Sequence, residues 1–348
     1  MIVARTWEEV EALADRWNRT SWQTERAELA YFEAEGGTPL AFFDDDGALV
    51  GRVEDHALES RLGYVRVYAP RVRLLRVSGI AGEAAALARA ALTEVDVVGV
   101  PALPVASAEY RSLAPLGGER FVRAWSRRRL DLPESFDEFL ASRSRKIRAG
   151  IRYDAKKLEA SLGDRLRVAT FRAPDAELFA DLDAVSQATY QRSLGHGFSP
   201  DRAEVLSVAL EHDWARVYLL YDGERAIAYW QCGVHNQTMR LGSTGYLPEY
   251  ARLRPGIYLL MRVIEDAIAD PGLRVLDFGP GRSDYKRHFS NDSYEERNLL
   301  LFAPTLRAQR VRLVRTIVAA LTYGARRVLD ATGATQRIKT AWRRRLRA

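Results

Sequence analysis

Apolar residues in the first third of the chain come in short runs separated by turn-forming residues. Such runs are typical of β-strands, and we expect strands at residues 28–35, 39–43, 48–53, 64–68 and 74–77. Glycines and aspartates at 36–37 and 44–47 predict hairpin turns. An alanine-rich helix, a buried strand and a short helix are expected next, at residues 82–92, 95–100 and 106–113. The pattern predicts one α/β domain over residues 1–130.

A similar order of elements returns after residue 131. Ser135, with Glu138 three residues later, has the spacing of a capping box and predicts a helix start. The expected order is then a strand, two helices, three strands, a helix and two strands, at residues 166–170, 175–190, 201–211, 216–221, 225–234, 238–245, 256–269, 275–278 and 297–302. This order predicts a second α/β domain over residues 131–304 and a helical tail over residues 305–348.

Basic residues gather in two segments. The tail carries twelve Arg and Lys and a single acid, Asp330, whereas residues 1–304 carry 40 basic and 45 acidic groups. We therefore expect the tail to meet an anionic partner, and we do not expect the body to bind nucleic acid. The second basic segment, residues 142–159, is interpreted either as a solvated helix face or as an anion-binding arm between the domains.

Several classes of protein are excluded or disfavoured by simple counts. The single cysteine, Cys232, excludes a disulfide framework, and the five histidines share no ligand spacing, so no metal is expected. Cys232 itself is expected to be a buried, inert thiol. No apolar run approaches eighteen residues, and the N-terminus lacks the apolar core of a signal peptide. We expect a cytoplasmic protein, with membrane association of the tail as an open alternative.

Residues 275–281, with the sequence VLDFGPG, resemble the first motif of class I methyltransferases. Ser283 occupies the position of the third glycine of that motif, and no strand–helix unit follows. A nucleotide-binding first strand should open a domain, whereas this strand nearly closes one. An S-adenosylmethionine-dependent methyltransferase is therefore kept only as a remote alternative.

A second set of residues covers more of the chain. Tyr-x-Pro-x-Tyr precedes a Pro-Gly helix start, and a strand ending in aspartate leads to a glycine turn and Tyr-Lys-x-x-Phe; the residues are Tyr246, Pro248, Tyr250, Pro255, Gly256, Asp277, Gly279, Gly281, Tyr285, Lys286 and Phe289. With the order of elements, this set resembles GNAT-superfamily acyltransferases of the exopolysaccharide- and cellulose-associated (CelD-like) and Fem-like tandem type, over residues 135–300. The resemblance implies an α/β fold of two GNAT-like modules, with mixed, mainly antiparallel sheets flanked by helices, before the basic helical tail.

The resemblance also implies a donor site at the start of helix 256–269. In GNAT proteins, backbone N–H groups at this helix start hold the pyrophosphate of the acyl-CoA co-substrate, as helix N-termini favour anions. The corresponding residues here are Arg252, Arg254, Pro255, Gly256 and Ile257. Only Arg252 and Gly256 remain of the usual Q/R-x-x-G-x-G/A loop, so aminoacyl-tRNA stays open as an alternative donor.

The chemistry of acyl transfer needs an acid for the leaving group and a base for the amine. The resemblance places Tyr285 as the general acid, and Lys286 as a group that binds a phosphate of donor or acceptor. The general base stays open between a water relay and three residues, Asp277, Glu249 and His235. The residues expected to bind the substrate are Gln231, Tyr246, Gly279 and Gly281.

We therefore expect an acyl-CoA-dependent N-acyltransferase, an acetyltransferase, that acts on an amino sugar or a similar amine of a glycan precursor in polysaccharide or cell-envelope biosynthesis. Two alternatives stay open. One is a Fem-like aminoacyltransferase that acts on a peptidoglycan precursor. The other is a non-catalytic GNAT-like scaffold that its basic tail recruits to a membrane or a complex.

The tail shows a helical pattern of its own. Its apolar stripe is Val311, Val314, Val318 and Leu321, and its first turns hold Arg307, Arg310, Arg312 and Arg315. Trp342 and the arginines 343–345 lie near the end of the chain. The stripe either packs on the body or attaches the protein to an anionic membrane surface.

Overall fold

The computed structural model describes residues 1–62, 65–117, 124–189, 197–281 and 283–331. Two compact units interleave along the chain. The first unit comprises Met1–Ala14, Gly37–Ala124 and the chain from Glu296 onward, and the second comprises Asp15–Gly36 and Trp125–Glu295. This division differs from the continuous segments suggested by the sequence, because residues 15–36 join the second unit and the chain after Glu296 joins the first.

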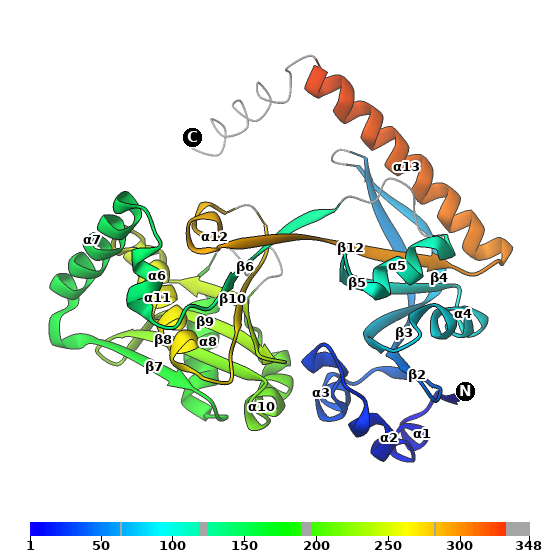
Figure 1. The fold of residues 1–348 in the computed structure, drawn as a ribbon, viewed down its shortest axis with the longest axis horizontal. Helices are drawn as coiled ribbons and strands as arrows, with labels where there is room; N and C mark the ends of the chain where they lie inside the picture. The colour runs from blue at the N-terminus through cyan, green and yellow to red at the C-terminus, as the bar shows by residue number, and fades with distance from the viewer. Residues whose placement is uncertain (63–64, 118–123, 190–196, 282, 332–348) are drawn as a thin grey trace. The chain divides into compact units, whose positions relative to one another are not determined.

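The first unit is built on a mixed sheet of six strands in the order β1-β2-β3-β4-β5-β12. Their bounds are Ile2–Ala4, Thr38–Phe43, Ala48–Leu62, Val65–Ala81, Val97–Pro104 and Asp292–Phe302. Neighbouring strands are antiparallel except β4 and β5, which are parallel and are joined by helix α4, Ala84–Glu94. The unit also contains the short helices α1, Trp7–Glu11, and α5, Ala108–Leu113 (Figure 1).

The second unit has its own six strands, in the order β6-β11-β10-β9-β8-β7. Their bounds, in chain order from β6 to β11, are Trp125–Asp131, Leu166–Phe171, Ala215–Asp222, Arg225–His235, Thr238–Tyr246 and Val275–Pro280. The helices are α2, α3, α6, α7, α8, α10, α11 and α12, at Ala14–Arg19, Leu29–Glu35, Phe136–Ala141, Arg145–Leu162, Ala176–Gln187, Ala203–Glu211, Pro255–Ala269 and Asp284–Phe289. Helix α11 buries much of one face against β8–β10, so it forms part of the core of this unit.

The two units repeat one arrangement. In each, three antiparallel strands lead into a helix and then into a strand parallel to the third, as β2-β3-β4-α4-β5 and β8-β9-β10-α11-β11. The sixth strands are exchanged: β6 follows the first unit but pairs with β11, and β12 follows β11 but pairs with β5. The predicted α/β class of mixed, mainly antiparallel sheets flanked by helices is confirmed.

One predicted strand is wrong, and three others are short pieces of a longer hairpin. Residues 28–35 form helix α3, whose buried Phe32 packs against Trp17 with ring centroids 5.0 Å apart. The segment holds three Glu and two Ala, which favour helices, and the apolar run alone did not reveal this. The strands expected at 48–53, 64–68 and 74–77 belong to the long hairpin of β3 and β4 (Figure 1).

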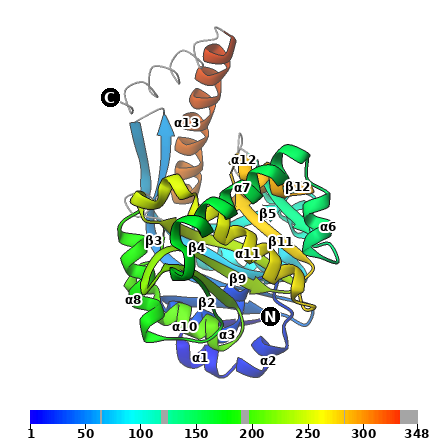
Figure 2. The same ribbon diagram turned by 90° about the vertical axis from the view of Figure 1, so that its left-hand side faces the viewer.

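The tail forms helix α13, Leu306–Ala331, which packs along β3 and β4 within the first unit (Figures 1 and 2). Ala308 and Val311 are fully buried there, and Val314 packs beside them. The predicted stripe therefore packs on the body at Val311, Val314 and Val318, whereas Leu321 is exposed. Trp342 and residues 343–345 lie outside the described residues.

Candidate active site

The parallel strands β10 and β11 of the second unit separate before either strand ends. Their ladder pairs Thr238 with Val275, Met239 with Leu276 and Arg240 with Asp277, and it stops there although β10 runs on to Tyr246 and β11 to Pro280. A bulge between Leu241 and Thr244 shifts β10 against β9 at the same level. The backbone beyond Asp277 is therefore not paired across the two strands, and we call this divergence the fork.

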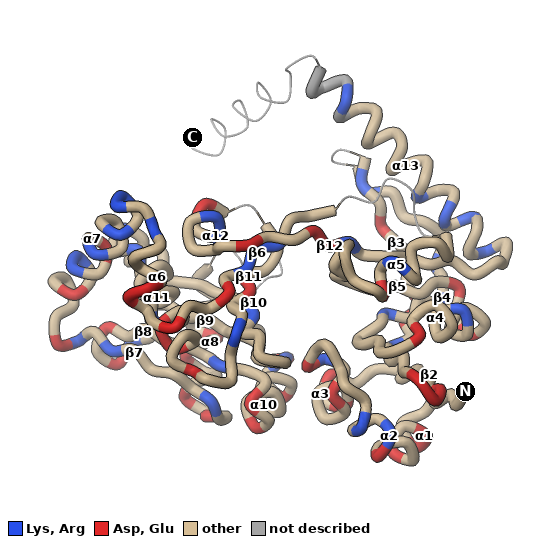
Figure 3. Tube along the Cα trace, in the orientation of Figure 1, with Lys and Arg blue, Asp and Glu red and all other residues tan. Residues whose placement is uncertain are grey.

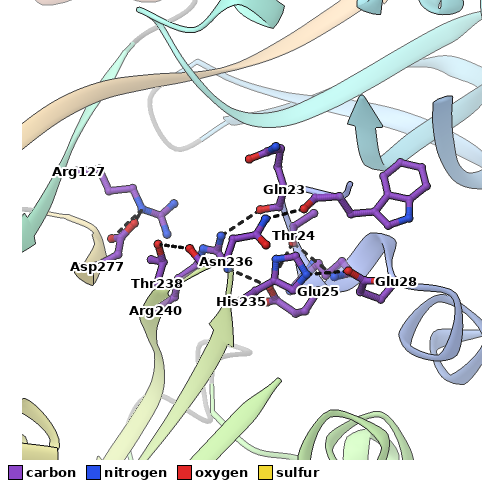
Figure 4. Close-up of polar contacts among 12 residues, drawn as sticks. Gln23, Thr24, Glu25, Glu28, Arg127, His235, Asn236, Thr238, Arg240 and Asp277 are labelled. Carbon is purple, nitrogen blue, oxygen red and sulfur yellow. Dashed lines mark hydrogen bonds and ion pairs between the residues drawn. The ribbon is translucent and has the colours of Figure 1, made fainter. Parts of the chain in front are cut away.

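Asp277 is buried at the closed end of the fork. Its carboxylate accepts hydrogen bonds from Arg127 Nε at 3.0 and 2.8 Å, from the Gly279 N–H at 2.7 Å and from the Tyr294 hydroxyl at 3.1 Å. Figure 4 shows the Arg127–Asp277 pair beside Arg240. With both oxygens engaged, the contacts favour a role for Asp277 in positioning the turn after β11 over a role as general base.

The turn after β11 is held from inside by Lys286. Gly279 and Gly281 have φ angles of +71° and +119°, which glycine adopts without strain. The Lys286 ammonium donates to the Pro280 carbonyl at 2.7 Å, and the side chain is buried. Burial lowers the pKa of Lys286, and the nearby Asp277 carboxylate opposes this shift. The contact with Pro280 shows that the amine shapes the turn.

Tyr285, in the first turn of α12, is partly buried between two aromatic rings. Its ring meets Trp230 and Phe278 edge-on, with centroids 6.4 and 6.5 Å apart. Burial raises the pKa of Tyr285 to about 12, so the phenol stays protonated at neutral pH. Among the described residues its hydroxyl has no hydrogen-bond partner. Within the described chain the phenol is thus a proton donor without an acceptor.

The start of α11 lies next to the same aromatic group. The Trp230 indole N–H donates to the Gly256 carbonyl at 3.1 Å, which joins the first turn of α11 to the ring that packs on Tyr285. Arg254, in left-handed conformation, occupies the cap position without a capping side chain. The Gly256 N–H has no partner within the described part of the chain. In the described chain, the start of α11 therefore offers an unused N–H donor and the positive end of the helix dipole.

Charged side chains of helix α7 lie beside the start of α11, and one of them pairs with an arginine there. The Arg254 guanidinium pairs with the buried Asp154 of α7 at 2.7 Å, and the Lys157 ammonium donates to the Arg252 carbonyl at 2.9 Å. Figure 2 shows α7 beside α11. The charge of Arg254 is thus already paired, whereas Arg252 is exposed. Sequence spacing did not reveal Asp154, Lys157, Trp230 or Arg127 as neighbours of the site.

Two further predicted residues line the β10 side of the fork. The Gln231 side-chain oxygen accepts from the Ser243 hydroxyl at 2.9 Å, within the bulge of β10. Tyr246 ends β10, and its ring lies 3.6 Å from the place a Cβ on Gly256 would take. The structure therefore brings the predicted residues of β9, β10, β11, α11 and α12 into one neighbourhood.

The two other candidates for a general base lie outside the fork. Glu249 is exposed and pairs with Arg225 at 2.7 Å, and a hydrogen bond to its own backbone, with the Arg225 contact, lowers its pKa. His235 is the last residue of β9, and its Nε2 is 2.8 Å from the Glu28 carboxylate (Figure 4). Its Nδ1 is buried without a partner in the described chain. Both side chains are thus engaged outside the fork.

Metal and thiol chemistry find no support in the described residues. No group of three or more His, Cys, Asp and Glu side chains there is arranged to hold a metal ion. Cys232 is buried in the core, and burial raises the pKa of its thiol, so the expectation of an inert thiol is confirmed. No helix in the described part is long and apolar enough to cross a membrane.

Comparison with known proteins identifies the fold around this site. Residues 145–287, from α7 to α12, match the family described as "Acetyltransferase (GNAT) domain". The match confirms the GNAT resemblance for the second unit, whereas the CelD-like subtype stays a prediction. No curated protein sequence matches the chain.

Solved structures extend the likeness to both units. The structure described as FemX has a TM-score of 0.59 and 10% identity, over 90% of this chain and 100% of that one. The C-terminal domain of a putative lysylphosphatidylglycerol synthetase from Agrobacterium fabrum has a TM-score of 0.54 and 13% identity, over 89% of this chain and 96% of that one. L-PGS from Bacillus licheniformis has a TM-score of 0.53 and 14% identity, over 90% of this chain and 97% of that one. At these identities the likeness shows a common fold alone.

Proposed function

We propose that the protein transfers an acyl group to an amine at the fork of the second unit. The observation that carries the proposal is the unpartnered hydroxyl of Tyr285, joined through Trp230 to the uncapped start of α11. This arrangement supports a donor substrate with an anionic group, which would bind at the start of α11, and an acyl group, which would lie in the fork. The match of residues 145–287 to a GNAT domain supports the same reaction class.

Acetyl-CoA or another acyl-CoA is the proposed donor. Its pyrophosphate would meet the Gly256 N–H and the positive end of α11, with Lys157 and Arg252 nearby for further charge. The acyl chain would run between β10 and β11 beyond Asp277, where the ladder between the two strands has ended. Gln231 and Tyr246 would border the acceptor.

The proposed step forms a C–N bond and breaks the bond from the acyl carbon to the leaving sulfur. The neutral amine attacks the carbonyl carbon, and the tetrahedral intermediate then expels the thiolate. Tyr285 is the proposed donor of the proton to this sulfur, since its phenol is protonated at neutral pH. The proton lost by the amine goes to water, because Asp277, Glu249 and His235 are each engaged elsewhere.

The proposed acceptor is an amino sugar or a similar amine of a glycan precursor in polysaccharide or cell-envelope biosynthesis, as the CelD-like resemblance implies. A cytoplasmic location with a small-molecule or glycan-precursor partner belongs to the same proposal.

A second candidate is aminoacyl transfer from tRNA, as in Fem-like enzymes. One observation favours it: the α11 start keeps only Arg252 and Gly256 of the CoA-binding loop, and Arg254 is paired with Asp154. The fold shared with FemX and with lysylphosphatidylglycerol synthetase domains agrees with this candidate as well. In that reaction the Tyr285 proton would go to the ribose oxygen of the tRNA.

Calorimetric titration of the full chain with CoA, acetyl-CoA and aminoacyl-tRNA separates the candidates. Binding of CoA and acetyl transfer to a panel of amino sugars is the expected outcome. Aminoacyl transfer without CoA binding would select the second candidate. Binding of neither donor would contradict both and leave the scaffold alternative.

A further inference from the structure

Helix α13 has a second apolar face, opposite the one that packs on the first unit. Successive residues in an α-helix are about 100° apart, which places Leu306, Leu313, Ile317 and Leu321 along one side. These side chains are 80%, 59%, 50% and 54% exposed. The buried stripe of Val311 and Val318 lies on the other side, so the exposed leucines and isoleucine play no part in that packing.

Arginines frame this exposed face, and acids are absent from it. No Asp or Glu occurs between residues 305 and 329. Arg310 and Arg327 are exposed beside the leucines. Arg307 and Arg315 lie on the flank that meets the hairpin, where they donate to the carbonyls of Arg71 and Glu59. Figure 3 shows basic segments along α13 and no acidic ones.

The tip of the β3–β4 hairpin also exposes apolar side chains. Val65 and Tyr68 are 61% and 57% exposed there. The Thr322 hydroxyl of α13 is 3.0 Å from the Arg61 carbonyl, which places the end of β3 beside the second half of the helix. We define the α13 face as Leu306, Leu313, Ile317 and Leu321 with Arg310 and Arg327.

From this surface we infer that the α13 face docks on an anionic lipid bilayer and lies in the plane of its interface. Apolar side chains would enter the boundary between headgroups and acyl chains, while the arginines meet anionic headgroups. The arginines at 307, 310, 312 and 315 interrupt the apolar residues, so the helix does not meet the requirements for crossing a bilayer. The inference concerns the first unit and does not rest on the proposed activity.

The charge pattern favours lipid over other occupants of the α13 face. A second copy of the helix would bring arginines against arginines with no acid to balance them. A nucleic acid would neutralise the arginines but would leave the leucines and the isoleucine in water. An anionic bilayer surface would neutralise the arginines and would also bury the apolar side chains.

The test is flotation of the full chain with vesicles of phosphatidylcholine alone and of phosphatidylcholine with phosphatidylglycerol. We expect binding to the anionic vesicles, weakened by high salt. The triple variant Leu313→Gln, Ile317→Gln and Leu321→Gln should bind at least about tenfold more weakly, because apolar burial is lost. Arg310→Gln with Arg327→Gln should weaken binding about 25-fold at low salt, at about fivefold per charge. Both variants change exposed side chains, so thermal unfolding should stay unchanged.

The matched control carries Arg152→Gln and Tyr153→Ser on α7, which remove an exposed arginine and an exposed apolar ring from the second unit. It should bind vesicles like the unchanged chain. Weaker binding of this control with unchanged binding of the α13 variants would overturn the inference. So would equal binding to neutral and anionic vesicles, or binding to neither. A dimer in solution that the triple variant converts to monomers would assign the face to a second copy instead.

Discussion

Arg127 on β6 donates from Nε to both carboxylate oxygens of Asp277 on β11, at 3.0 and 2.8 Å, and both side chains are largely buried. The two residues are 150 positions apart in the chain. The pair connects the strand that enters the second unit to the strand that ends at the glycine turn. Because Asp277 also accepts from the Gly279 N–H, the pair fixes where this turn begins.

Asp277→Asn should destabilise the protein by on the order of 3 kcal/mol, because it leaves the buried Arg127 guanidinium without its counter-charge. Urea unfolding of the variant measures this loss. The control is Glu249→Gln, which breaks the exposed pair with Arg225 and should leave the urea midpoint nearly unchanged. Equal losses of unfolding free energy in the two variants would show that the buried Arg127–Asp277 pair stabilises the protein no more than the exposed pair does.

Tyr285→Phe should lower kcat by on the order of 10²-fold if its phenol protonates the leaving group. The free energy of unfolding should change little, because the hydroxyl has no partner among the described residues. Steady-state kinetics with the identified donor measures this, and Tyr250→Phe, which loses a hydrogen bond to Asp222, is the control. Full activity of Tyr285→Phe would exclude the acid role.

Gly256→Asp should abolish binding of a phosphate-bearing donor, because it puts a carboxylate at the start of α11. A Cβ at this position meets only the Tyr246 ring at 3.6 Å, an ordinary contact, so both Gly256→Asp and the control Gly256→Ala should fold. Calorimetry should show donor binding by Gly256→Ala and none by Gly256→Asp. Unchanged affinity in Gly256→Asp would move the donor site elsewhere.

Lys286 should make stability depend on pH below its ordinary pKa of 10.5, because burial lowers its pKa in the folded protein. Between the folded and the unfolded pKa, the unfolded chain binds more protons, so the stability contributed by Lys286 rises with pH. The same contribution is lost as the pH falls through the folded pKa. Relative to Lys286→Met, the unchanged protein should therefore gain stability from pH 7 toward pH 10.

Urea unfolding of both proteins at several pH values measures this difference. The control is Lys146→Met on α7, where the ammonium is exposed and remains hydrated in the folded protein. If the difference in unfolding free energy between the unchanged protein and Lys286→Met stays constant with pH, burial of the ammonium does not cost stability. Lys286→Met should also loosen the glycine turn, because the donor to the Pro280 carbonyl is lost.

The local pattern of residues determined the class of fold and much of the candidate site. Most of the apolar runs, the turn at residues 44–47 and the Pro255–Gly256 helix start are local signals that were placed within a few residues of the observed elements. The residues from Gln231 to Lys286 belong to one such repeated unit, so its fold gathers them without further information. The strong charge of the tail was likewise visible from composition alone.

Tertiary structure decided what depends on partners far away in the chain. Residues 28–35 became a helix because Phe32 packs against Trp17, and a short apolar run fits either a strand or a buried helix. The exchange of β6 and β12, and the pairing of Arg127 with Asp277, join segments that no local period connects. In α13 the spacing showed that apolar faces exist, but only packing on the β3–β4 hairpin decided that Val311 is buried while Leu313 and Leu321 meet solvent.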